Sequence, residues 1–452
     1  MSGEWPMVPV SELATAVVGG TPSRNVAEYW HGDIPWATAK DVAAVSGRYL
    51  EKVEEHITCE GLENSAAKLL PKSTVVITAR GTVGAMAQLG REMAFNQTCY
   101  ALLPKDGVDN DFLFYALKGT ITEMRVLSYG TIFETITTKT FDHWLVPLPP
   151  LPEQRAIAHI LGALDDKIEL NRRMSETLEA MARALFKSWF VDFEPVRAKM
   201  EGRWKRGQSL PGLPAYLWDL FPDRLVDSEL GEIPEGWDVA TLADFAALNL
   251  ESWSKDTRPE VIRYVDLSNT KWGRIEAVTT HTRHDAPSRA QRVLRPGDTL
   301  VGTVRPGNGS YALVAEEGLT GSTGFAVLRP QKAEWAEFVY LAATAASNID
   351  TLAHLADGAA YPAVRPEVVA STPVVRPDDS VLGEFSKYAA PLLARMAQSE
   401  RESRTLAALR DALLPKLLSG KIDVPACAAD VAAGRSALEG AADPPAQAGE
   451  VA

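Results

Sequence analysis

The residues that could support catalysis occur in this chain only as fragments of familiar arrangements. Asp165-Asp166-Lys167 resembles part of a metal-dependent nuclease site, but it falls within a predicted helix and has no upstream carboxylate partner. His281 and His284 have a spacing that a metal ion could use, but no third ligand accompanies them. We therefore interpret the first group as a solvated helix face and the second as a polar turn.

Sequence signatures of methyl transfer and nucleotide binding are also incomplete. A methyltransferase acting on exocyclic amines would carry an Asn/Asp-Pro-Pro-aromatic tetrapeptide, and Asp443-Pro444-Pro445-Ala446 lacks the aromatic residue. A phosphate-binding P-loop needs Lys and Ser or Thr after its second glycine, but Gly307 is followed by Asn308. The sequence predicts no catalytic residue, cofactor or metal site.

The chain instead repeats itself once, with a shift of about 225 residues. The residues that coincide under this shift are Asp41 and Asp266, Pro71 and Pro296, Thr74 and Thr299, Arg80 and Arg305, Gly84 and Gly309, Thr98 and Thr323, and Tyr115 and Tyr340. A period of this length indicates a duplicated domain rather than a solenoid unit. Two similar halves predict two similar surfaces, and hence a ligand with two similar parts.

Composition is that of a folded protein with room for two domains. The chain has 452 residues, of which 46% are hydrophobic and 23% charged. Its three cysteines are far apart, which argues against a disulfide framework. No run of 18 apolar residues occurs and Met1–Val10 lacks signal-peptide order, so we expect a cytoplasmic protein. The net charge of −13 does not exclude a nucleic-acid ligand, because local patches govern attraction.

Each copy of the repeat is followed by a long predicted helix. A 4,3 spacing of mostly apolar residues runs from Ile157 to Trp189 and again from Phe385 to Leu417, which is the pattern of a coiled-coil seam. Both seams turn polar at matching positions, which are Asn171 and Ser175 in the first helix and Ser399 and Ser403 in the second. The matched register favours packing of the two helices on each other over packing of each helix on its own domain.

Several strings resemble the specificity (S) subunits of type I restriction-modification systems. Gly19-Gly20-Thr21-Pro22-Ser23, Tyr29-Trp30, Gly32-Asp33-Ile34-Pro35-Trp36 and Lys40-Asp41 resemble the opening of a target-recognition domain. Leu148–Arg155 and Ala182–Phe193 resemble the central conserved region of these subunits, and Leu409–Gly420 resembles the distal one. The second domain departs from the pattern, because it has Leu248-Asn249-Leu250-Glu251-Ser252 in place of Gly-Gly-Thr-Pro-Ser.

With this resemblance, the expected fold is α+β. It would have two tandem mixed α/β target-recognition domains separated by two long antiparallel coiled-coil helices, with a pseudo-twofold internal repeat. The expected segments are 1–150 for the first domain, 151–194 for the first helix, 195–230 for a connector, 231–375 for the second domain, 376–422 for the second helix and 423–452 for a disordered acidic tail.

The resemblance also implies a function. Each target-recognition domain would read one half of a split, asymmetric sequence in double-stranded DNA. The helices would act as a spacer and as docking surfaces for two methyltransferase (M) subunits, and restriction (R) subunits would join through the M complex. The S subunit itself would be non-catalytic and hold no cofactor, because methylation, translocation and cleavage would belong to the M and R subunits.

Two arginines are the leading candidates for DNA contacts. Arg80 and Arg305 each follow a predicted strand and stand beside glycines that let the backbone approach a phosphate. The weaker candidates are Thr21, Ser23, Lys40 and Thr82 in the first domain, with Asn308, Tyr361 and Arg365 in the second.

Four aromatic residues, Phe186, Trp189, Phe190 and Phe193, cluster at the end of the first helix. An exposed patch of this size usually marks an interface, so we expect them to face an M subunit or the junction between helix and domain.

The sequence leaves other hypotheses about the function open. They are a fused methyltransferase or nuclease with unrecognised motifs, a scaffold that has lost DNA binding, and the S subunit of a related system that cuts on both sides of its site.

Overall fold

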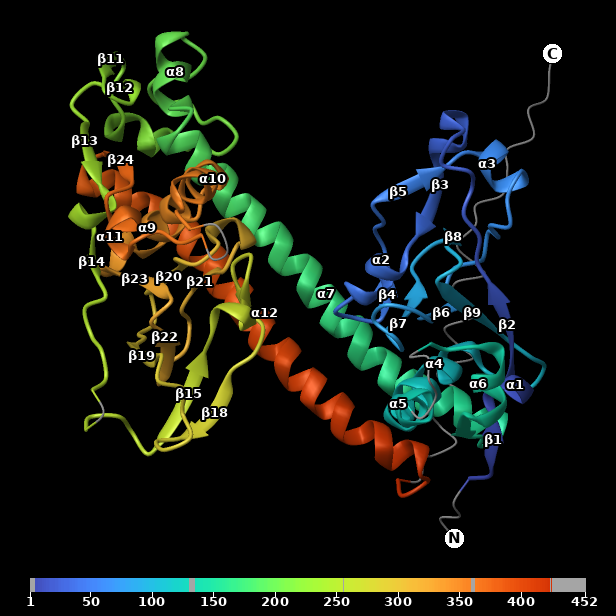
Figure 1. Ribbon diagram of the computed structural model, residues 1–452. Coiled ribbons are helices and arrows are strands. Elements are labelled where there is room, and N and C mark those ends of the chain that lie inside the picture. The colour runs from blue at the N-terminus through green and yellow to red at the C-terminus, as the bar shows by residue number, and fades with distance from the viewer. Residues whose placement is uncertain (1–4, 130–134, 255, 359–361, 423, 425–452) are drawn as a thin grey trace, which may run out of the picture. The chain divides into compact units, whose positions relative to one another are not determined.

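The computed structural model describes residues 5–129, 135–254, 256–358, 362–422 and 424. It divides into two compact units, formed by residues 1–171 with 402–452 and by residues 172–401. Two 40-residue helices, α7 (Leu151–Phe190) and α12 (Asp379–Leu418), contribute to both units, and Figure 1 shows them in green and red. Each unit therefore combines one domain with part of each long helix. The expected disordered tail lies almost wholly outside the described residues.

The first unit is built on two sheets. The larger sheet has the strand order β2 (Ala14–Val18), β9 (Cys99–Pro104), β6 (Val75–Thr78), β7 (Met86–Leu89) and β4 (Tyr49–Leu50). The smaller has the order β5 (Glu55–Ile57), β3 (Trp30–Ala37) and β8 (Ala94–Phe95), and β1 (Met7–Pro9) pairs with β10 (Leu145–Pro147). The helices are α1 (Val10–Leu13), α2 (Ala39–Ala43), α3 (Cys59–Glu63), α4 (Asn110–Gly119), α5 (Ile121–Tyr129) and α6 (Thr138–His143), with a 3-10 turn η1 (Ala27–Tyr29).

The second unit has two four-stranded sheets. One has the order β14 (Ala246–Leu248), β23 (Phe325–Pro330), β20 (Thr299–Gly302) and β21 (Tyr311–Leu313); the other has β18 (Thr279–Thr282), β15 (Val261–Val265), β22 (Leu319–Ser322) and β19 (Ala290–Val293). The paired strands are β11 (Leu225–Ser228) with β12 (Gly231–Pro234), β13 (Asp238–Thr241) with β24 (Pro373–Arg376), and β16 (Thr270–Lys271) with β17 (Arg274–Ile275). Its helices are α8 (Glu194–Met200), α9 (Ala336–Ala343), α10 (Ala346–Leu355) and α11 (Pro366–Ala370), with 3-10 turns η2 (Ala215–Leu220), η3 (Leu242–Asp244), η4 (Leu267–Asn269), η5 (Pro306–Asn308) and η6 (Ala333–Trp335).

The strand topology confirms the internal repeat. In the first unit β3 is antiparallel to β5 and parallel to β8, and in the second β15 is antiparallel to β18 and parallel to β22. The central strands β2-β9-β6-β7 and β14-β23-β20-β21 follow the same order with the same antiparallel pairing. The chain therefore folds the same α/β plan twice, as the sequence predicts.

Residues that recur in the repeat have matching structural roles. Asp41, the third residue of α2, accepts a hydrogen bond from the amide of the N-cap residue Thr38 at 2.8 Å. Asp266, the N-cap residue of η4, accepts one from the Leu267 amide at 2.6 Å, so both carboxylates bind an amide at the start of a helical turn. The tyrosines Tyr115 and Tyr340 are buried, and each donates to a carboxylate on α7. Tyr115 meets Asp165 at 2.7 Å in the first unit, and Tyr340 meets Glu179 at 3.5 Å in the second.

The two long helices run antiparallel, as expected. In the first unit Asp165 pairs with Arg410, and Asn171 donates to Glu402 at 3.1 Å, so numbering rises along α7 as it falls along α12. In the second unit Trp189 packs on Phe385, with ring centroids 5.8 Å apart. The predicted seam residues are buried or half-buried, including the polar positions Asn171, Ser175 and Ser399, which are buried, and Ser403, which is half-buried.

The structure corrects two interpretations made from the sequence, each at one residue. Asp165 is not on a solvated helix face, because it is buried between Tyr115 of α4 and Arg410 of α12. The residues next to Asp165 in the sequence do not indicate that α4 and α12 cover it. His281 does not lie in a turn, because it pairs with Ile262 in the β18–β15 ladder, whereas His284 lies in the turn after β18, as predicted.

The aromatic cluster at the end of α7 is buried rather than exposed. Phe186, Trp189, Phe190 and Phe193 belong to the main hydrophobic core of the second unit. The ring of Phe190 lies 5.0 Å from Phe338 of α9, so the cluster joins the helix to the domain. Of the two places expected for these side chains, this is the helix–domain junction. Their burial makes them unavailable to a partner in this structure.

Candidate nucleic-acid interface

One end of the larger sheet in the first unit gathers most of the candidate residues of the first domain. Val18 pairs with Tyr100 and Thr78 pairs with Cys99, so the C-terminal ends of β2 and β6 lie beside the start of β9. The loops 19–23, 79–85 and 96–98 therefore emerge together. Backbone bonds join them, from the Gly20 amide to Phe95 at 2.9 Å and from Ala79 to Thr98 at 2.8 Å. Thr21, Ser23, Arg80 and Thr82 all lie in these loops.

The turn that carries Arg80 is tightly constrained. Gly81 and Gly84 have φ values of +77° and +81°, which glycine adopts at little cost. The Thr78 hydroxyl closes the turn by accepting from the Ala85 amide at 3.0 Å. The Arg80 side chain is exposed and has no hydrogen-bond or ion-pair partner among the described residues. A rigid turn thus holds a guanidinium whose five donors can bind an external acceptor.

The weaker candidates of the first domain differ in their availability. The Thr21 hydroxyl donates to the amide oxygen of Gln97, and Ser23 is exposed. Lys40, in α2, lies 2.7 Å from Glu54, and its hydrogen bond to this carboxylate raises the pKa of Lys40. Both side chains of that pair are exposed, so water screens the attraction and Lys40 can exchange Glu54 for another anion.

The second unit presents corresponding loops at the equivalent sheet end. Gly302 pairs with Phe325, which sets the loop of Arg305 and Asn308 beside the turn before β23. The Thr303 amide donates to Gly324 at 2.8 Å, and the Val364 amide donates to Thr303 at 2.9 Å. Arg365, the exposed N-cap residue of α11, therefore follows a segment anchored to the same loop. Tyr361 lies outside the described residues.

Arg305 has an unusual backbone conformation. Its φ is +48°, in the left-handed region that residues other than glycine rarely adopt, and its amide donates to the Pro362 oxygen at 2.7 Å. Such conformations cost about 1–3 kcal/mol and cluster at ligand sites. In the first domain the φ of Arg80 is not positive, and the next residue, Gly81, has a positive φ. The two arginines correspond in the repeat but are presented by different turns.

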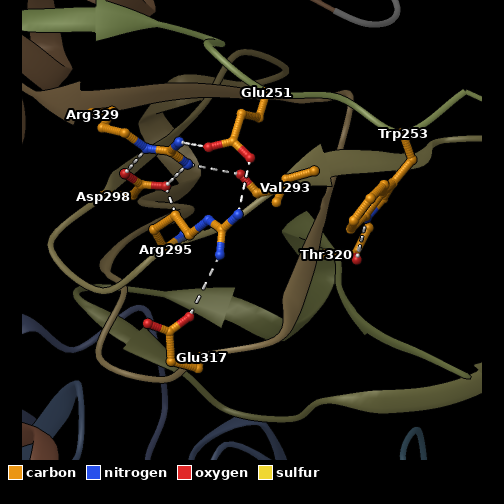
Figure 2. Close-up of polar contacts among 8 residues, drawn as sticks. All are labelled: Glu251, Trp253, Val293, Arg295, Asp298, Glu317, Thr320 and Arg329. Atoms are coloured by element: carbon orange, nitrogen blue, oxygen red, sulfur yellow. Dashed lines mark hydrogen bonds and ion pairs between the residues drawn. The ribbon is translucent and has the colours of Figure 1, made fainter. Parts of the chain in front are cut away.

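An ion-pair network holds the segment that replaces Gly-Gly-Thr-Pro-Ser in the second domain (Figure 2). Glu251 accepts from Arg295 at 3.1 Å and also from Arg329, and these bonds lower the pKa of Glu251. Arg329 binds both oxygens of the buried Asp298 at 2.8 Å and donates to the Val293 oxygen at 3.2 Å. Charged side chains therefore help to hold this segment, whereas in its counterpart the Thr21 side chain makes a neutral contact with Gln97.

Sequence reasoning missed some members of this surface. Gln97 binds Thr21 and precedes Thr98, which recurs as Thr323, so the repeat itself pointed to that loop. Arg24, next to Ser23, lies 3.8 Å above the Trp30 ring and pairs with Glu55. The third residue that sequence reasoning missed is Trp272, which lies against the loop of Arg305. No sequence pattern indicated that this side chain would be exposed.

Neither a metal cluster nor a membrane span is found in the described ranges. No group of three or more His, Cys, Asp or Glu side chains there could hold a metal ion. No helix there combines the length and the apolar character that crossing a bilayer requires.

Known proteins resemble this chain in sequence and fold. A family model for the type I restriction modification DNA specificity domain matches residues 2–180. The MjaIX specificity subunit of Methanocaldococcus jannaschii is 25% identical over 443 residues, covering 93% of this chain and 94% of that protein. The HindI specificity subunit of Haemophilus influenzae is 26% identical over 362 residues, covering 69% and 77%. The chain spans most of each of these two relatives.

A solved structure shares the fold. The S subunit of a type I restriction-modification system from M. genitalium has a TM-score of 0.56 at 17% identity, covering 91% of this chain and 96% of that one. These likenesses accord with the duplicated domain and the paired long helices. Residues 2–180 match the DNA specificity domain of type I restriction-modification systems, and most of the chain is similar to the specificity subunits of such systems.

Proposed function

We propose that this chain is the non-catalytic subunit that sets the DNA sequence specificity of a type I restriction-modification complex. Each domain reads one half of a bipartite, asymmetric site in double-stranded DNA. The observation that carries this proposal is the repeated surface. Equivalent sheet ends in the two units present Arg80 and Arg305 from turns beside glycines, as two half-site readers would require. Base edges in the major groove offer the acceptors that arginine binds best.

Partner subunits would dock along the long helices. In the first unit, α7 leaves Leu170 exposed and α12 leaves Leu409 exposed; in the second, α7 leaves Met181 exposed. Single exposed apolar side chains are ordinary on a protein surface, so this docking role rests on the likeness to type I specificity subunits. We assign this role to two M subunits, with R subunits joining through them in the cytoplasm. Methylation, translocation and cleavage would then be carried out by these partners.

The test is an arginine-to-alanine pair measured in the complex with the cognate M subunits. Arg80→Ala should weaken binding to the cognate duplex by about 1–3 kcal/mol and relax the sequence preference in one half-site only. Arg305→Ala should relax the other half-site. The measurement is binding selection from a randomised DNA pool, followed by titration of the selected duplexes.

Arg91→Ala is the matched control. Arg91 is exposed and follows β7, whose C-terminal end lies opposite the end that carries Arg80, so its loss should leave both half-sites unchanged. Equal weakening on all sequences, with a smaller dependence on salt, would contradict base reading and assign the arginines to phosphate contacts.

A further inference from the structure

The hairpin β16–β17 has an unexpected residue at its turn. Lys271 pairs with Arg274, so Trp272 and Gly273 form the two-residue turn. Their φ values are +48° and +86°, and a type I′ turn needs positive φ at both positions. Asn or Asp before glycine suits this geometry, whereas a bulky side chain rarely adopts it. Turn formation therefore gives no reason for a tryptophan here.

Trp272 lies against the loop of Arg305 and Asn308. Its amide donates to the Gly309 oxygen at 2.7 Å, and the Gly273 amide donates to Tyr311 at 2.9 Å. The indole covers Gly309 so closely that a Cβ there would meet ring atoms at 2.6–2.7 Å. The ring also meets Tyr311 edge to face, with centroids 6.0 Å apart. These contacts fix the ring beside the candidate arginine.

The outer face of the indole is open. All eleven tryptophans lie in the described part of the chain, and Trp272 alone is exposed, with 58% of its surface accessible. The preceding residue, Lys271, is exposed as well. An apolar ring beside a cation matches the two chemical faces of DNA, because the ring can stack on a sugar or base while the ammonium meets a phosphate.

The first domain has no such ring at the equivalent position. There β4 runs parallel to β7 with Tyr49 opposite Gln88, and in the second domain Gly273 forms a parallel bridge with Ala312. Gln88 falls on Leu313 under the shift of 225 residues, so Tyr49 corresponds to Arg274, and the counterpart of Trp272 is Gly47, which has no side chain. An aromatic side chain is therefore offered to the ligand by the second domain only.

On the basis of the proposed DNA-binding function, we propose that Trp272 packs against the duplex beside the base pairs contacted by Arg305. The second half-site is then held by an aromatic contact in addition to hydrogen bonds. Proteins that insert or lay apolar side chains on DNA often unstack or bend it, and the energy of that deformation depends on the local sequence. Trp272 would thus contribute specificity at base pairs that no hydrogen bond reads.

The test uses the full chain in complex with its cognate M subunits and a duplex carrying the sequence selected by the wild type. Trp272→Ala should weaken binding about 5- to 150-fold, the range of one lost aromatic–base contact, and Trp272→Phe by about threefold or less. Trp272→Ala should leave the slope of log affinity against log salt unchanged, whereas Lys271→Ala should reduce it by about 0.9. The fluorescence of Trp272, measured as the difference between the wild type and Trp272→Phe, should be quenched when the wild-type complex binds DNA.

Val261→Ala is the control. Val261 is 62% exposed at the N-terminal end of β15, whereas the hairpin of Trp272 follows the C-terminal end of that strand, so this substitution should not affect binding. Wild-type affinity in Trp272→Ala, or Trp272 emission unchanged by DNA, would overturn the proposal. Loss of M-subunit assembly in Trp272→Ala, seen by size exclusion, would overturn it in favour of a protein contact. A wild-type complex that does not prefer its selected duplex would overturn the proposed function itself and the Trp272 contact with it.

Discussion

Arg329→Ala should lower the free energy of unfolding by about 3–5 kcal/mol, because it leaves a buried carboxylate without its cation. Asp298 is almost fully buried, and Arg329 binds both of its oxygens at 2.8 Å. The substitution also removes one of the two arginines that hold Glu251. Denaturant unfolding of the full chain, followed by tryptophan fluorescence, measures the loss.

Arg295→Ala is the matched control for this substitution. Arg295 binds the same Glu251, but half of its side chain is exposed, so its loss should cost about 1 kcal/mol or less. The arginines lower the pKa of Glu251, so their contribution is present above the ordinary carboxylate pKa and is lost as pH falls through the lowered value. Equal losses from the two substitutions would contradict the assignment of the buried pair as the stronger one.

Arg410→Ala should destabilise the first unit by a similar amount, about 3–5 kcal/mol. Arg410 is the cation that the buried Asp165 meets, and the same carboxylate accepts the Tyr115 hydroxyl. The substitution therefore breaks a polar contact that joins α12, α7 and α4. The measurement is again denaturant unfolding of the full chain.

Asp411→Ala provides the comparison for Arg410→Ala. Asp411 also pairs with Arg410, at 2.8 Å, but most of its side chain is exposed, so its loss should cost about 1 kcal/mol or less. A small effect of Arg410→Ala would mean that Asp165 finds water or another donor. The polar contact would then not fix the alignment of α7 and α12.

The repeat and the long helices could be predicted because both are visible as residue patterns, the repeat as matching residues about 225 positions apart and the helices as a 4,3 spacing. The 4,3 spacing fixes one helix face whatever that face meets, and the repeated Asp41 and Asp266 are explained by helix caps formed within a few residues. These patterns do not indicate which residues each helix face contacts. Asp165 was therefore misplaced and the burial of Phe190 was not foreseen, since their neighbours Arg410 and Phe338 are far away in the sequence.

The candidate surface divides in the same way. Arg80 and Arg305 could be proposed as DNA contacts because the repeat aligns them. The contacts of Glu251 and Trp272 occur only in the second domain, so aligning the two copies could not reveal them. Glu251 acts through Arg295, which follows β19, and Arg329, which lies in β23. Trp272 depends on a hairpin that the first domain lacks.

The most direct test of the account is to map the adenines methylated by the wild-type complex and by its Arg80→Ala and Arg305→Ala variants in one host genome. The account predicts a wild-type site of two specified blocks separated by unspecified base pairs, with each variant relaxing a different block. One continuous block, or two variants that relax the same block, would contradict the assignment of one half-site to each domain.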